Sequence, residues 1–149
     1  MLTQAAASAN VVPLHDEEAE VSEGSWLGHE ADREWEYDPG REGQPDALRW
    51  RVLVSREVTP SRGLAMGTME VPSGAELAPH HHHPLETYYI AGGSAEVYDG
   101  EMWVPVEKGH VAYWPEDHPH GIRNRGEGVC TVVWAFPTDS YYEIEYIDE

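Results

Sequence analysis

A succession of short strand-like segments after residue 48 is the feature that most constrains the fold. Each is rich in β-branched or aromatic residues, and turn-forming residues separate them at roughly ten-residue spacing, as in all-β sandwiches and barrels. The segments cover residues 49–58, 64–71, 86–91, 94–106, 110–114, 128–136 and 141–147. Within residues 94–106, the pair Asp99-Gly100 predicts a hairpin turn. No stretch after residue 48 has a convincing helical period, so an all-β fold is expected.

The chain of 149 residues suits one domain with one core. Residues 49–149 are expected to form the β-barrel, and residues 1–48 an N-terminal arm or extension that packs partly on it. Residues 1–24 are small, polar and acidic, which favours a loose arm. Residues 25–47 mix Trp26, Trp35 and Tyr37 with glycine, proline and charge, and fit either a short helix or an extended strand.

The charge balance restricts the partners. There are 28 acidic and 9 basic side chains and a formal net charge of −19, which argues against binding to nucleic acid or to anionic membranes. Acidic excess also fits a salty habitat or a need for solubility. Cys130 is the single cysteine, and neither a signal peptide nor an apolar run of ~18 residues is recognised. We therefore expect a cytoplasmic protein with a small-molecule substrate.

Histidines gather in two clusters, His80 to His83 and then His118 and His120. A His-x-His pair on a strand places both imidazoles on one face, because side chains alternate with period two. A short turn at Pro84 then brings the Glu86 carboxylate beside them. Borderline divalent metals take imidazole nitrogen and carboxylate oxygen, so the pattern predicts a metal site.

These stretches resemble the two motifs of the cupin superfamily. The first reads Gly, five residues, His-x-His, three or four residues, Glu, six residues, Gly, and its counterparts are Gly74, His80, His82, Glu86 and Gly93. The second reads Gly, five residues, Pro-x-Gly, two residues, His, three residues, Asn, and its counterparts are Gly109, Pro115, His120 and Asn124. Asp117 departs from the family glycine, which leaves the construction of that turn open. The resemblance implies a single cupin-type β-barrel (double-stranded β-helix, or jelly roll) with an irregular N-terminal extension.

The spacing also selects a register within the histidine run. Counting from Gly74 selects His80, and counting back from Glu86 selects His82. The alternative pair, His81 and His83, leaves only two residues before Glu86. His81 and His83 are then solvated or supporting histidines, and His118 is a residue of the rim.

The resemblance implies one divalent metal per chain, held by His80, His82, Glu86 and His120. These four ligands would saturate a tetrahedral zinc, whereas an octahedral ion keeps two cis positions for water or substrate. Fe(II) is favoured, and Mn(II), Ni(II), Co(II) and Zn(II) remain compatible.

Tyr88 lies two residues after Glu86 and should point to the same side of the strand. A phenol near a divalent cation can become a phenolate, which is a competent general base; the alternative is a core tyrosine with a hydrogen-bond partner. The Glu-x-Tyr arrangement resembles the small cupins that cleave dimethylsulfoniopropionate (DMSP) to dimethyl sulfide and acrylate. There the metal binds the substrate carboxylate and a tyrosine starts a β-elimination. The resemblance assigns Tyr88 as this base.

Aromatic side chains could hold the sulfonium cation. The candidates are Trp103, Trp114, Trp134 and Phe136, for which ordinary core packing is the alternative. Three other functions remain open: an Fe(II)-dependent cupin dioxygenase, a sugar isomerase and a non-catalytic binding cupin. Arg123 should point away from the metal. Because cupins often pair through edge strands, the resemblance also suggests a homodimer.

Overall fold

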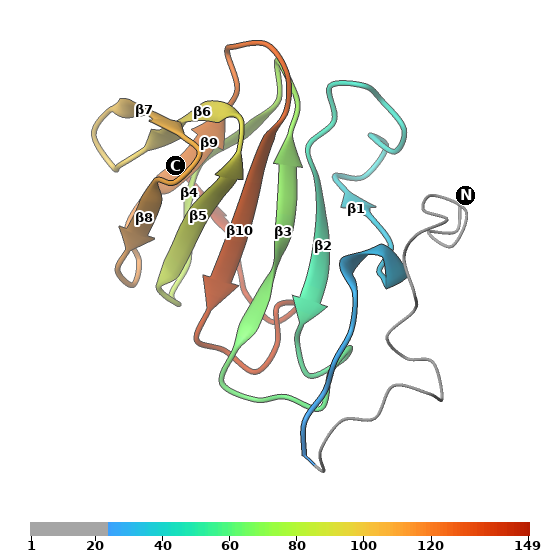
Figure 1. Ribbon diagram of the computed structural model, residues 1–149. Helices are drawn as coiled ribbons and strands as arrows, with labels where there is room; N and C mark the ends of the chain where they lie inside the picture. The colour runs from blue at the N-terminus through green and yellow to red at the C-terminus, as the bar shows by residue number, and fades with distance from the viewer. Residues whose placement is uncertain (1–23) are drawn as a thin grey trace.

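The computed structural model describes residues 24–149 and arranges them in two antiparallel β-sheets that face each other (Figure 1). The six-stranded sheet has the order β1-β2-β3-β10-β5-β8. Its strands are β1 (Glu36–Tyr37), β2 (Arg49–Val54), β3 (Ala65–Val71), β10 (Cys130–Phe136), β5 (Glu86–Gly92) and β8 (Val111–Trp114). The five-stranded sheet has the order β11-β4-β9-β6-β7. Its strands are β11 (Ile147–Asp148), β4 (Glu76–His81), β9 (His120–Arg123), β6 (Ser94–Tyr98) and β7 (Trp103–Glu107).

Alternation of buried and partly exposed residues forms the core between the sheets. The paired strands β3 and β10 alternate along seven residues each, so every second side chain points inward. The inward residues Val71, Val132 and Phe136 are at most 1% exposed. Burial of a side chain of this size contributes about 1.5–3 kcal/mol to the free energy of folding. The alternating buried residues also fix the register of the central strands. The all-β fold expected from the sequence is confirmed.

The hairpin expected at Asp99-Gly100 is also present. It joins β6 to β7, and Gly100 has the positive φ of 105° that such a turn requires. The Asp99 carboxylate accepts hydrogen bonds from the backbone N–H groups of Glu101 and Met102, at 2.9 Å each. The turn is therefore closed by its own side chain.

The segment before β2 contains both elements that the sequence left open. A short 3-10 helix spans Glu30–Asp32, and β1 pairs with β2. The guanidinium groups of Arg49 and Arg51 lie 4.2 and 4.0 Å from the Trp35 ring centroid, which attaches this segment to the outer face of β2. The expected loose arm lies, apart from Gly24, outside the described residues. Within residues 24–149, no helix has the length and apolar character needed to cross a bilayer.

The prediction of a strand over residues 141–147 is wrong. Only Ile147–Asp148 forms a strand, and the Ile144 N–H donates to the Tyr141 carbonyl in a turn. The backbone N–H of Tyr141 donates to the Ser55 hydroxyl at 3.0 Å, which turns the chain away from a strand course. Two strands that carry candidate ligands, β4 and β9, had not been delimited from the sequence.

Asp117 occupies the turn position at which the cupin motif has glycine, and its φ is 59°. The side chain of an L-residue in this left-handed region costs roughly 1–2 kcal/mol, less for aspartate. The Asp117 N–H donates to the His82 carbonyl, so the turn supports the candidate metal site.

We expect Asp117→Gly to be more stable than Asp117→Ala by about 1–2 kcal/mol. Both variants lose the contact between Asp117 and His83, so the difference between them isolates the backbone conformation. Urea unfolding followed by tryptophan fluorescence measures it. Equal stabilities would show that the backbone at residue 117 is not strained.

Candidate metal centre

Four side chains from three strand ends meet inside the barrel. His80 lies on β4, His82 directly follows that strand, Glu86 begins β5 and His120 begins β9. Each is at most 3% exposed, and their ligand atoms all lie within 4.8 Å of one another. These are the residues that the sequence spacing selected. The chain therefore has a three-histidine, one-carboxylate cluster that could hold a divalent metal.

The other histidines of the two clusters have partners away from this centre. The His81 Nδ1 contacts the Glu149 carboxylate, and the His83 Nδ1 lies 3.2 Å from the Asp117 carboxylate on the exposed rim. The His118 Nε2 lies 2.6 Å from the Asp99 carbonyl.

Backbone carbonyls fix the tautomer of all three buried imidazoles. The Nδ1 atoms of His80, His82 and His120 each lie 2.8 Å from a carbonyl oxygen. The acceptors belong to Ala78, Pro84 and His118. A carbonyl can only accept, so each Nδ1 carries the proton and each Nε2 presents a lone pair. Metal-binding histidines are oriented in this way in proteins.

The Nε2 lone pairs and the Glu86 carboxylate face one another. Glu86 Oε2 lies 2.7 Å from His120 Nε2 and 3.1 Å from His82 Nε2, while His80 Nε2 is buried without a hydrogen-bond partner. With Nδ1 protonated and the rings neutral, these contacts place acceptor against acceptor, and either a proton on Nε2 or a cation between the groups relieves the repulsion. The residues present therefore fit a bound divalent metal.

The pKa shifts differ along the ligand set. Burial lowers the pKa of His82, but the contact with Glu86 outweighs burial and raises it, so a protonated His82 would release its proton when a metal binds. Burial lowers the pKa of His80 to about 4, so its imidazole is unprotonated at neutral pH. Burial alone would raise the pKa of Glu86, but His120 and His82 lower it below its usual value and keep the carboxylate ionised. Metal ligands must be deprotonated, so neither His80 nor Glu86 has to lose a proton first.

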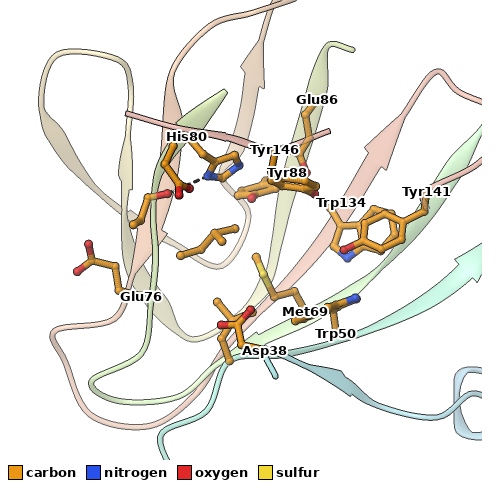
Figure 2. A pocket seen from close by; sticks show the side chains of 14 residues that line it. Asp38, Trp50, Met69, Glu76, His80, Glu86, Tyr88, Trp134, Tyr141 and Tyr146 are labelled. Carbon is orange, nitrogen blue, oxygen red and sulfur yellow. Dashed lines mark hydrogen bonds between the residues drawn. The ribbon is translucent and has the colours of Figure 1, made fainter. Parts of the chain in front are cut away.

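A cavity of about 470 Å³ adjoins this cluster (Figure 2). His80, Glu86 and Tyr88 contribute to its wall. The Tyr88 ring is 1% exposed and packs edge-on against Trp114, with ring centroids 4.9 Å apart. Burial raises the pKa of the Tyr88 phenol well above 10, and the charge of Glu86 raises it further. A cation beside Glu86 would reverse that second effect.

The four aromatic residues singled out in the sequence have different surroundings. Trp134 lines the cavity. Trp114 stacks on the His120 ring, with ring centroids 4.6 Å apart, and Phe136 meets the His82 ring edge-on at 5.1 Å. Both therefore support ligand residues instead of lining the cavity.

The Trp103 ring centroid lies 4.1 Å from the Arg123 guanidinium. Arg123 also donates to Glu96 at 2.9 Å, so Trp103 and Arg123 lie together on the outer face.

The cavity also has lining residues that the sequence reasoning missed. Asp38 and Trp50 come from the N-terminal side, and Tyr141 and Tyr146 come from the C-terminal side. The Tyr146 ring lies 5.0 Å from the ring of His80 and 5.2 Å from that of His82. The clustering of three tyrosines at 141, 142 and 146 was the available signal, but it had been interpreted as a strand.

Comparison with known proteins agrees with the geometry. The sequence profile of the Cupin domain family matches residues 67–136, which include all four candidate ligands and Tyr88. This chain carries a cupin domain. The match spans the barrel strands from β3 to β10, so residues 24–66 and 137–149 are additions to the part of the cupin that the profile describes.

Individual proteins resemble the cupin over different lengths. Dimethylsulfoniopropionate lyase DddW of Ruegeria pomeroyi is 31% identical over 99 residues, which are 66% of this chain and 64% of that protein. The polyketide cyclase RemF of Streptomyces resistomycificus superposes with a TM-score of 0.67 at 19% identity, over 83% of this chain and 84% of its own. The DMSP lyase DddQ of Ruegeria pomeroyi superposes with a TM-score of 0.64 at 23% identity, over 79% and 61%. The two structural matches support the fold.

Proposed function

We propose that this cupin is a metal-dependent carbon–sulfur lyase that cleaves dimethylsulfoniopropionate to dimethyl sulfide and acrylate. The observation that carries the proposal is the position of Tyr88. Its buried phenol lines the same cavity as Glu86 and His80, in a chain 31% identical over its aligned part to a DMSP lyase. A lyase of this kind needs a base beside a site for the substrate carboxylate, and the proposal assigns these roles to Tyr88 and to the candidate metal centre.

His80, His82, Glu86 and His120 would hold the metal, for which we propose Fe(II). Three imidazoles and one carboxylate leave two open positions on a six-coordinate ion. When bound, such an ion withdraws charge from the substrate carboxylate and makes the adjacent α-proton more acidic.

Tyr88 is proposed to act as the general base after its phenol has lost a proton. The phenolate oxygen takes the α-proton, and the electrons of that C–H bond form the double bond of acrylate. The bond between the β-carbon and sulfur breaks, and dimethyl sulfide leaves with the electron pair of that bond. The proton on Tyr88 then passes to water, so the residue returns to its starting state. The Tyr88 side chain is 1% exposed, so its phenol is shielded from bulk solvent and exchanges protons only with water in the cavity.

The test is release of dimethyl sulfide. We expect chain reconstituted with Fe(II), Mn(II), Co(II), Ni(II) or Zn(II) to convert DMSP to headspace dimethyl sulfide and acrylate in equal amounts with at least one metal. Chelator-treated chain without added metal is the control. Absence of dimethyl sulfide with all five metals would reject the proposal. Oxygen uptake with Fe(II), recorded in parallel, would favour a dioxygenase instead.

A further inference from the structure

The two ends of the cavity differ in chemistry. Figure 2 shows His80 and Glu86 along one side of the pocket and Asp38 across from them, with Met69 and Trp50 beside Asp38. The first side offers the lone pairs of the candidate metal ligands. The opposite side offers the Asp38 carboxyl group next to apolar and aromatic surface.

Acidic residues line the cavity without basic residues to balance them. Four carboxylates line the cavity, and among its described lining residues there is no lysine or arginine. They are Asp38, Glu76, Glu86 and Asp148. Glu86 belongs to the candidate metal centre, so three carboxylates remain to face a ligand. The aromatic faces of Trp50, Trp134 and Tyr141 lie in the same wall and add to the attraction for a cation.

A second observation concerns the inner end of the cavity. His80 lines it and is only 2% exposed, and its Nε2 atom has no hydrogen-bond partner. Burial of such an atom without a partner is costly, and the candidate metal, to which a ligand carboxylate could also bind, would supply the missing interaction. The cavity therefore has a polar inner end and a negatively charged outer side.

Much of the outer side is supplied by segments outside the part of the chain that the Cupin domain profile matches. Asp38, Leu48 and Trp50 precede residues 67–136, which the Cupin domain profile matches. Tyr141, Tyr146 and Asp148 follow them. Asp38 is therefore separated in the chain from the residues of the candidate metal centre.

We propose that Asp38 is the specificity-determining residue that binds the cationic group of an onium carboxylate, a small zwitterion with a sulfonium or quaternary ammonium at one end. The carboxylate end of the ligand lies at the histidine cluster, and Trp50 and Met69 contact the alkyl groups on the cation. This inference rests on the proposed function, because it takes the same cavity as the substrate site. The inference goes beyond the proposed function because it assigns substrate selection to the N-terminal extension.

A matched pair of ligands tests the charge alone. In 3-(trimethylammonio)propanoate the terminal group is cationic, and in 4,4-dimethylpentanoate a carbon atom replaces the nitrogen at nearly the same volume. Titration calorimetry on the metal-loaded chain gives both dissociation constants. We expect the cationic ligand to bind at least about tenfold more tightly, because its charge faces three carboxylates and aromatic rings.

Asp38→Asn should weaken binding of 3-(trimethylammonio)propanoate by about fivefold and leave the dissociation constant of 4,4-dimethylpentanoate within about twofold. Glu107→Gln is the matched control, since it removes the same charge from an exposed position on β7 that does not line the cavity. Glu107→Gln should leave the dissociation constants of both ligands unchanged. Both positions are exposed, so neither variant disturbs the core.

The outcomes separate this inference from the lyase proposal. If Asp38→Asn leaves the preference for the cation unchanged, or weakens both ligands equally, the assignment of Asp38 is overturned while the substrate site itself stands. If the unmodified chain binds neither ligand, the cavity is not a general onium carboxylate site and this inference is overturned, whereas release of dimethyl sulfide from DMSP decides the lyase proposal separately.

Discussion

His120→Ala is expected to lower bound metal from one ion per chain to well below that value. Zinc sites with four protein ligands contribute about 10–16 kcal/mol, or about 3 kcal/mol per ligand, so loss of one ligand weakens binding by about 100-fold. His120 is 1% exposed and its Nε2 lies 2.7 Å from Glu86 Oε2, so its imidazole lies inside the cluster and not on the surface. The measurement is metal content by mass spectrometry after passage over a chelating resin.

The run of four histidines demands a matched control, because surface histidines also collect metal. His83→Ala removes a neighbour of His82 whose side chain is 78% exposed and contacts Asp117. We expect this variant to keep one ion per chain. His82→Ala should behave like His120→Ala, and near-UV circular dichroism should report folded barrels for all three. Unchanged metal in both His82→Ala and His120→Ala would contradict the assignment.

The barrel and the ligand set could be predicted because both depend on the spacing of residues that lie close together in the sequence. Along β10, Val132, Trp134 and Phe136 alternate with residues that face outward, and this period alone marks an inward face. The ligand spacing is equally local, since His80, His82 and Glu86 lie within seven residues and one turn. The register within the run follows because a shift of one residue would turn both imidazoles outward.

The strands β4 and β9 were harder to delimit because their sequences lack a strong strand pattern. β4 contains Pro79, and its pairing with β9 shifts between Leu77 and His80. β9 has only four residues, of which Gly121 has no side chain to reveal an alternation. Both strands form because neighbouring strands pair with them. This pairing joins residues far apart in the sequence, so the strand propensity of each short segment does not predict it.

The walls of the cavity could not be predicted for the same reason. Trp103 and Trp134 look alike in sequence, but Trp103 pairs with the outward Tyr98 whereas Trp134 pairs with the inward Tyr88. The position of Tyr141 depends on a hydrogen bond from its backbone to Ser55, at the end of a distant strand. Asp38 reaches the cavity only because β1 pairs with β2. The sequence thus predicted the side of the cavity that carries the candidate metal ligands and missed most of the opposite wall.

The second large effect is expected from Tyr88→Phe, which should keep the metal and lose most of the lyase activity. The substitution removes one oxygen atom and retains the ring that packs against Trp114 at 4.9 Å, so the core and the ligand residues should not move. General base catalysis typically contributes 10²–10⁴-fold, and we expect a loss of about that size in kcat for dimethyl sulfide release. Because binding of the substrate carboxylate does not use the phenol, KM should change little.

Tyr89→Phe is the matched control. The two tyrosines are neighbours on β5, but Tyr89 is 45% exposed on the outer face while Tyr88 is 1% exposed. The control should retain activity within about twofold, because surface substitutions seldom change stability by more than ~0.5 kcal/mol. Tyr146→Phe tests a second tyrosine of the cavity, whose ring lies beside the rings of His80 and His82. If Tyr88→Phe remained active and Tyr146→Phe did not, the base would be Tyr146, and the proton transfer would come from the C-terminal segment instead of the barrel strand.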